Sequence, residues 1–422
     1  MLEKYFVKPR TVDRIRTSWI AGAIEQYVAW MEARRYASRS FVSRVPLLVR
    51  FGEFARGRGA TRWDELPIHV EPFVEQCVAR NGKRREQGGR ALFARELRGP
   101  VEQMLRIAVP GFDAKGRKRE RVFPFLEQAP GFVTYLVDER GLRPTTVNSY
   151  AFGLRLFESY LQRIALAKLS DLSPVVISAF VVECAPRMAR TTLREWCGMI
   201  RVLLRYLHRE GVVGEHLAAS VDSPQAYRLA TLPRSIAWPD VKKVLADVDR
   251  RTPIGRRNYA ILLLLVTYGL RAREIVALTL DDVEWKAGRL RIPERKAGHS
   301  TAYPLSSVVG QALIEYLRGG RPDTPDRHMF FRGVAPYTPA TVSVISGVAS
   351  RALRSAGICV PRAGSHTLRH TCVQRLVDED FSFKSIGDYV GHRSADSTEI
   401  YTKIAVETLR KVALGDGEEV LR

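Results

Sequence analysis

A repeated helical pattern in the first half of this chain constrains its fold more than any other sequence feature. Residues 25–78 and 131–185 share the pattern, with YVAWMEARRYASRSF in the first copy and FVTYLVDERGLRPTTV in the second. In both copies apolar residues recur at spacings of three and four, and those of one copy fall opposite those of the other. This spacing is typical of helices with one buried face. The sequence therefore predicts two copies of one all-helical unit.

Local signals place the ends of these predicted helices. Ser38 or Ser40 in the first copy, and Pro144 with Thr145 in the second, are residues that favour helix starts. Each copy is followed by a further Arg-rich helical pattern, at 90–107 and 190–208. Each unit is thus predicted to be about a hundred residues long.

The second half of the chain has a different pattern. Between 214 and 236 the periodicity gives way to Ser, Pro and Gln in SVDSPQAYRLATLPRS, which is typical of a linker. A helix is then predicted at 238–248, and the apolar run 259–270 is too short to span a bilayer and predicts a buried helix. Two β-prone runs, 288–293 and 300–305, flank a turn and predict a hairpin.

The predicted fold is therefore mainly α, with a small antiparallel β-sheet (α+β) in the C-terminal domain and all-α N-terminal domains. The predicted domains are an N-terminal helical domain at 1–112, a second helical domain at 125–215, a linker at 216–236 and a C-terminal domain at 237–422.

The charge of the chain predicts a polyanionic partner. The 422 residues include 67 Lys and Arg against 45 Asp and Glu, a net charge of +22. Such a surplus favours nucleic acid over a membrane, because it is spread along the chain and is not gathered on one amphipathic helix. We expect these arginines of the helical units to contact DNA phosphates: Arg39, Arg44, Arg50, Arg190, Arg194, Arg201 and Arg205.

The C-terminal half carries, in order, the residue types that exchange of a phosphodiester requires. They are Arg271 and Glu274, Lys296, His366 and Arg369, and finally His392 and Tyr401. Two guanidinium forks can grip the non-bridging oxygens, and an ammonium can protonate the leaving oxygen. A His can orient or deprotonate the nucleophile, and a tyrosyl oxygen can form a reversible phosphotyrosine. The exchange conserves bond energy, so it needs no ATP, and neither a metal carboxylate cluster nor a CxxC pair or Cys/His cluster is present in the sequence; we therefore expect no metal and no cofactor.

The order GLRxxE, hairpin Lys, HxLRH, and GH followed nine residues later by Tyr resembles the tyrosine recombinase (phage integrase) family. The resemblance covers residues 232–414 and extends more loosely to 130–213, which is similar to the family's helical core-binding domain. It implies that Arg271 and Arg369 bind the scissile phosphate, that Lys296 is the general acid and that Tyr401 is the nucleophile.

The resemblance gives the remaining residues secondary roles. His366 would assist proton transfer, His392 would hydrogen-bond the phosphate, and Glu274 would brace the region of Arg271. A C-terminal helix at about 403–414 would dock on a neighbouring protomer.

Parts of the sequence depart from the family pattern. Tyr268 and Arg273 stand where the family more often has a small residue and Ser or Thr. The hairpin reads ERKAGHSTAYPL, so Arg295 competes with Lys296 for the role of general acid. The duplicated helical unit is similar to the longer recombinases of transposon-like mobile elements, some of which are encoded beside partner recombinases.

The family resemblance implies a site-specific recombinase that integrates, excises or transposes a mobile element through a 3′-phosphotyrosine. The working form would be a tetramer on paired double-stranded DNA sites, in the cytoplasm with the nucleoid and without membrane contact. Two alternatives stay open, a DNA-relaxing enzyme similar to type IB topoisomerases and a non-catalytic DNA-binding relative. The sequence also leaves open whether 1–112 binds DNA or joins protomers.

Overall fold

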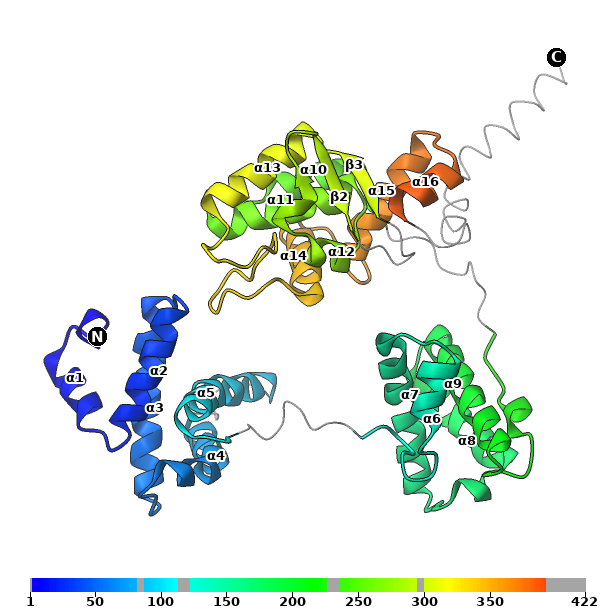
Figure 1. The fold of residues 1–422 in the computed structure, drawn as a ribbon, viewed down its shortest axis with the longest axis horizontal. Coiled ribbons are helices and arrows are strands. Elements are labelled where there is room, and N and C mark those ends of the chain that lie inside the picture. The colour runs from blue at the N-terminus through cyan, green and yellow to red at the C-terminus, as the bar shows by residue number, and fades with distance from the viewer. Residues whose placement is uncertain (1, 82–86, 113–121, 226–234, 294–299, 392–422) are drawn as a thin grey trace. The chain divides into compact units, whose positions relative to one another are not determined.

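The computed structural model describes residues 2–81, 87–112, 122–225, 235–293 and 300–391. The chain divides into two compact units, one built from Met1–Asp113 and Thr231–Arg422 and the other from Ala114–Ala230. Separate hydrophobic cores lie in the first helical region (2–112), the second helical region (122–225) and the C-terminal region (235–391). Helices dominate all three (Figure 1), which confirms the predicted mainly α fold class.

The first helical region consists of helices packed around buried aromatic rings. Its α-helices are α1 (Pro9–Arg16), α2 (Ala21–Ala33), α3 (Ser38–Arg56), α4 (Val70–Asn81) and α5 (Gln87–Ala108). Helix α3 begins at Ser38, one of the two predicted starts, and α5 packs against α2, α3 and α4. Tyr27, Phe41 and Phe51 have no exposed surface. Burial of such rings is a large part of what stabilises a small helical core.

The second helical region is also built from helices around buried aromatic rings, among them Phe132 and Phe157. Its α-helices are α6 (Phe132–Thr134), α7 (Pro144–Arg163), α8 (Pro174–Cys184) and α9 (Arg190–Arg209). Helix α7 begins at the predicted Pro144, since a proline at the first position lacks only an N–H that a helix start leaves unpaired. A 3-10 turn at Leu217–Ser220 lies in the segment predicted as a linker, yet Leu217 and Val221 are buried in the core of this region. These apolar side chains, together with a hydrogen bond from Arg201 of α9 to the carbonyl of Val221, hold that turn against α9.

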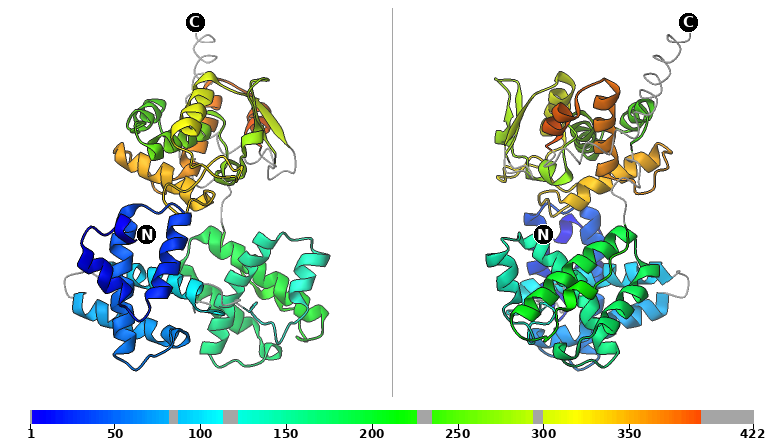
Figure 2. Two further views of the ribbon diagram at one scale, coloured as in Figure 1. Left: turned by 60° about the vertical axis from the view of Figure 1, so that its left-hand side comes forward. Right: turned by 90° about the vertical axis from the view of Figure 1, so that its right-hand side faces the viewer.

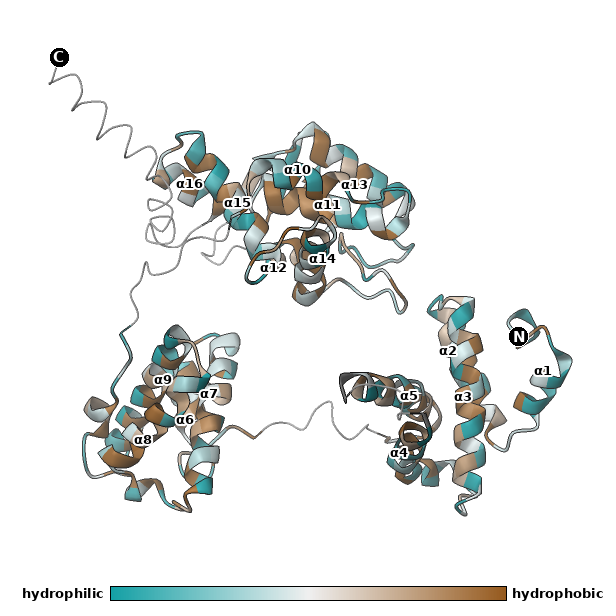
Figure 3. Cartoon of the chain, turned by 180° about the vertical axis from the view of Figure 1, so that it is seen from behind, coloured by the Kyte–Doolittle hydropathy of each residue, from teal (hydrophilic) through white to brown (hydrophobic). Residues whose placement is uncertain are grey.

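The C-terminal region is organised around α11, which lies in its middle (Figure 1). Its α-helices are α10 (Trp238–Ala246), α11 (Pro253–Thr267), α12 (Ala272–Ala277), α13 (Ser307–Gly319), α14 (Val342–Ser355), α15 (Ser365–Asp378) and α16 (Phe383–Val390). Helix α11 contacts α10, α12, α13, α14 and α15. Figure 3 shows it as a hydrophobic rod, and its run of leucines at 262–265 is buried. This confirms the predicted buried helix.

A small antiparallel sheet completes the C-terminal region (Figure 2), in the order β1 (Val283–Glu284), β2 (Arg289–Ile292) and β3 (Thr301–Pro304). Leu290 of β2 pairs with Tyr303 of β3, which confirms the predicted hairpin. Strand β1 was not predicted, because two residues are too few to show the alternation that marks a strand. The predicted helix at 403–414 lies outside the described residues. No helix in the described ranges is long and apolar enough to cross a membrane.

Candidate active site

The turn between α11 and α12 places Arg271. Gly269 has φ +57, a left-handed conformation that glycine adopts without a steric penalty. A Cβ at Gly269 would also lie 3.1 Å from Val390 Cγ1 and 3.2 Å from Cys372 Sγ. Glycine therefore lets α15 and α16 approach the chain just before Arg271, which then caps the start of α12.

Glu274 holds Arg271 in a fixed orientation. Its Oε2 accepts the backbone N–H of Arg271 at 2.8 Å, and its Oε1 accepts Nη1 at 2.9 Å. The carboxylate is fully buried, whereas the Arg271 side chain is 17% exposed. A buried carboxylate with two charge-assisted bonds fixes its partner tightly. The Nη2 of Arg271 donates to the carbonyl of Gly391 at 2.9 Å.

Arg369 on α15 reaches the same place from another direction. It is 5% exposed, and its Nη2 donates to the carbonyl of Val390 at 2.7 Å. Its Nη1 donates to the carbonyl of Gly269. The two arginines thus donate to neighbouring carbonyls, of Val390 and Gly391, at the end of α16. The structure therefore brings together Arg271 and Arg369, the two residues predicted to bind the phosphate.

His366 lies one turn before Arg369 on α15 and is exposed, whereas its neighbours Ser365 and Thr367 are buried. Its pKa is lowered, first because surrounding protein removes water from the ring and then because Arg369 and Arg271 carry positive charge nearby. The neutral imidazole is therefore favoured near pH 7. A neutral ring can accept a proton from a nucleophile, as the resemblance requires of this residue.

The last carbonyls of α16 each meet a different side chain. A helix end leaves such carbonyls without partners inside the helix. The hydroxyl of Tyr303 on β3 donates to the carbonyl of Tyr389, whereas Arg369 and Arg271 bind the next two carbonyls. Gly391 ends the helix with φ +65. Sequence reasoning did not identify Tyr303 or Tyr389, since a tyrosine at a strand end or a helix end is commonly a packing residue.

Three predicted site residues, Lys296, His392 and Tyr401, lie outside the described residues. Lys296 belongs to the segment that joins β2 to β3, and His392 directly follows Gly391 in the sequence.

The arginines predicted to contact DNA differ in their surroundings. Arg44 is half-buried and donates to Tyr27 Oη and Gln103 Oε1, both at 3.0 Å. Arg201 is half-buried and donates to the carbonyl of Val221 at 2.6 Å. These two side chains hold their own region together. The exposed members of the set are Arg39, Arg50, Arg190, Arg194 and Arg205.

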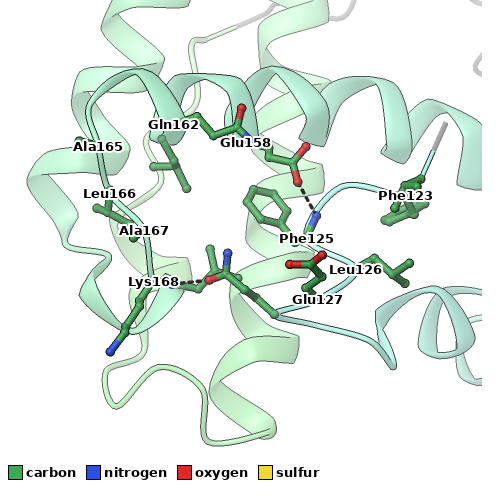
Figure 4. A pocket seen from close by; sticks show the side chains of 14 residues that line it. Phe123, Phe125, Leu126, Glu127, Glu158, Gln162, Ala165, Leu166, Ala167 and Lys168 are labelled. Carbon is green, nitrogen blue, oxygen red and sulfur yellow. Dashed lines mark hydrogen bonds between the residues drawn. The ribbon is translucent and has the colours of Figure 1, made fainter.

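A pocket of about 480 Å³ lies in the second helical region (Figure 4). Two of its polar lining groups are bound within the fold: Glu158 accepts the N–H of Phe125 and Gln128 accepts the N–H of Leu169, both at 2.8 Å. Over the described ranges, no group of three or more His, Cys, Asp or Glu side chains is arranged to hold a metal ion. The paired arginines therefore remain the candidate reaction site.

Comparison with known proteins matches both parts of the chain outside the first helical region. Residues 237–408 match the phage integrase family, and residues 130–211 match the phage integrase N-terminal SAM-like domain.

Two relatives from Sinorhizobium fredii (strain NGR234) carry the name integrase/recombinase. The first, y4rA, is 32% identical over 289 residues, which cover 68% of this chain and 70% of the relative. The second, y4rF, is 29% identical over 421 residues, which cover 98% of this chain and 95% of the relative. The match to y4rF therefore includes the first helical region.

The fold resembles that of a solved structure of the XerH site-specific recombinase bound to palindromic difH substrate, a post-cleavage complex. The TM-score is 0.55 at 18% identity, over 72% of this chain and 90% of the XerH chain. At this level of identity the likeness concerns the fold.

Proposed function

Because the chain belongs to the phage integrase family of tyrosine recombinases, we propose that it is a site-specific DNA recombinase acting through a 3′-phosphotyrosine. Its biological role is to integrate, excise or transpose a mobile element. The observation that carries the proposal is the convergence of Arg271 and Arg369, from separate helices, on adjacent carbonyls. Two fixed guanidinium groups next to each other match the two non-bridging oxygens of one phosphodiester.

In the proposed reaction the hydroxyl oxygen of Tyr401 attacks the scissile phosphorus. The new bond joins this oxygen to phosphorus, and the bond from phosphorus to the 5′ oxygen breaks. The phenol proton passes to neutral His366, and Lys296 gives a proton to the leaving 5′ oxygen. His392 donates a hydrogen bond to the phosphate. A 5′-hydroxyl from another strand then attacks the phosphotyrosine in the reverse sense, so the number of phosphodiester bonds is conserved and no ATP is consumed.

Arg271 and Arg369 stabilise the charge that develops on the non-bridging oxygens. Their bonds to Glu274 and to backbone carbonyls hold part of each fork in place before DNA arrives. Donors that are already oriented do not have to reorganise during the reaction, which is the main source of electrostatic catalysis. Glu274 is the positioning residue for Arg271.

We assign domain roles on the same basis. Residues 237–422 form the catalytic domain. The core-binding domain comprises 125–215 together with the turn at Leu217–Ser220 and Val221, which pack in its core, so the linker before 237 is shorter than the sequence predicted. The surplus of positive charge, +22 for the chain, supports double-stranded DNA as the partner. Residues 1–112 contribute a further DNA-binding domain.

The number of strands that must be cut supports a tetramer on DNA. Recombination between two duplexes cleaves four strands, and each protomer supplies one Tyr401. Four copies of the chain on two paired sites therefore provide one nucleophile per strand. We place this assembly in the cytoplasm, on the nucleoid.

The test is covalent trapping on a nicked duplex. Nicked duplexes made from the DNA that flanks the encoding gene are incubated with the protein without ATP or Mg²⁺, and adducts are separated on denaturing gels. We expect a covalent protein–DNA band with the native chain, and its complete loss in Tyr401→Phe. Tyr337→Phe, at an exposed tyrosine of the C-terminal region, is the matched control and should keep the band.

Two results would contradict the proposal. A band that persists in Tyr401→Phe would mean that another residue is the nucleophile. Tight binding by the native chain with no band would support a non-catalytic DNA-binding protein. If the band forms but strands are only rejoined to themselves, with relaxation of supercoils, the activity is that of a topoisomerase.

A further inference from the structure

Three tyrosines connect the elements that lead to the reacting groups. Tyr268 directly follows α11, Tyr303 lies on β3, and Tyr389 lies near the end of α16. The ring centroids of Tyr268 and Tyr303 are 5.0 Å apart, and those of Tyr303 and Tyr389 are also 5.0 Å apart. The rings of Tyr268 and Tyr303 are each 3% exposed. We call this group the tyrosine cluster.

The hydroxyls of the tyrosine cluster join the three elements in a closed cycle. Tyr268 donates to the carbonyl of Pro304 at 2.9 Å, which joins α11 to β3. Tyr303 donates to the carbonyl of Tyr389, which joins β3 to α16. Tyr389 donates to the carbonyl of Thr267 at 2.9 Å, which joins α16 back to α11. Tyr268 also accepts the N–H of Ser306 at 2.9 Å.

Each joined element leads directly to a proposed reacting group. Helix α11 leads through Gly269 to Arg271, β3 follows the segment that contains Lys296, and α16 precedes His392. A cycle of bonds among these elements fixes their relative positions more firmly than any single contact. An error of about 1 Å in the position of a catalytic group can cost a hundredfold in rate.

Apolar packing alone would not require these hydroxyls. A buried hydroxyl is costly unless it is hydrogen-bonded, and phenylalanine fills nearly the same volume without that cost. Here every hydroxyl of the cluster binds a backbone carbonyl of a different element. Burial raises the pKa of Tyr268, so its hydroxyl stays protonated and able to donate.

We propose that Tyr268, Tyr303 and Tyr389 are positioning residues for strand cleavage, and that the Tyr303 hydroxyl sets the hairpin that carries Lys296 relative to the end of α16. The inference rests on the proposed recombinase function and adds residues to it. Tyr303 acts through Lys296, because its hydroxyl binds the carbonyl of Tyr389 and fixes β3, the strand that follows the segment with Lys296. Its loss should therefore slow protonation of the leaving 5′ oxygen and leave DNA binding unchanged.

The test uses two leaving groups. In one nicked duplex the scissile bond has its normal 5′ oxygen, and in the other a sulfur replaces this bridging oxygen. A thiol has a pKa of about 8.5, far below that of an alcohol, so the sulfur leaves without a proton donor. Single-turnover cleavage rates at saturating protein are compared for the native chain, Tyr303→Phe and Lys296→Ala, with DNA affinity and melting temperature measured for each.

Tyr316→Phe is the matched control. Tyr316 is fully buried in the C-terminal region, and its hydroxyl accepts the N–H of Phe331 at 3.3 Å. The variant Tyr316→Phe therefore removes a buried hydroxyl from the same region but leaves every hydrogen bond of the tyrosine cluster in place. We expect it to cleave both substrates at the native rate.

For Tyr303→Phe we expect a rate about tenfold lower or more on the oxygen substrate and within about threefold of native on the sulfur substrate, as for Lys296→Ala. A native rate on the oxygen substrate would overturn the positioning role. An equal loss on both substrates would overturn it too, since the defect would then not lie in proton donation. Failure of the native chain on both substrates would instead contradict the proposed function itself.

Discussion

Arg369 of the C-terminal region and the exposed arginines of α9 have opposite surroundings. Arg369 is buried, and its guanidinium is held by the carbonyls of Gly269 and Val390. On α9, by contrast, Arg190 and Arg205 are exposed to solvent. Fixed arginines suit one phosphate in one geometry, whereas exposed arginines attract many phosphates through screened, long-range charge. We propose that the buried, fixed Arg369 acts in catalysis and that exposed arginines such as Arg205 act in DNA binding.

Replacing Arg369 should give the largest effect and tests the buried side of this contrast. Arg369→Lys keeps the charge but loses the planar fork, so we expect single-turnover cleavage to fall by about 10²–10³-fold while DNA affinity changes by less than about threefold. Cleavage of nicked duplexes and equilibrium binding give the two numbers, and the melting temperature checks the fold. A loss of affinity as large as the loss of rate would place Arg369 among the binding arginines.

Two variants of α9 should give an intermediate effect, and they test the role of the exposed arginines. Arg205→Ala should reduce the slope of log K against log salt by about 0.9, the contribution of one phosphate contact. Arg201→Ala should leave that slope unchanged and lower the melting temperature, because Arg201 holds the carbonyl of Val221 and the hydroxyl of Ser223. Binding titrations at several salt concentrations separate the two. Equal changes of slope would show that burial does not distinguish these arginines.

The smallest expected effect concerns His366, which is exposed but lies near the buried arginines. Its folded-state pKa is below the ordinary 6.5, so the unfolded chain binds more protons between these two values. The neutral form of His366 therefore contributes to the free energy of unfolding above about pH 6.5, the pKa in the unfolded chain. This contribution decreases as the pH falls from about 6.5 to the folded-state pKa. The melting temperature should therefore fall less between pH 7.5 and pH 5 in His366→Gln than in the native chain. An identical pH dependence would show that the pKa of His366 is not lowered in the folded chain.

Much of the helical plan followed from the sequence, because local rules act there. The starts of α3 at Ser38 and α7 at Pro144 depend on residues at one helix end, and the apolar period of α11 depends only on its own residues. The β2–β3 hairpin was predicted for the same reason. Strand β1 was missed because it exists only through pairing with β2. Burial of Leu217 and Val221 likewise depends on a core formed by distant helices.

The sequence by itself determined the residue types and the order of the candidate site, since chemistry needs particular side chains and these stand at recognisable spacings along the chain. Only the tertiary structure decided which of them meet. Arg271 and Arg369 lie on separate helices, and they converge because Gly269 admits α15 and α16 close to the turn after α11. The tertiary structure also decided that Arg44 and Arg201 face inward and that three tyrosines form one cluster. These contacts join segments that are far apart in the sequence. A local pattern cannot predict them, because it holds no information about which side chain of a distant segment will lie beside it.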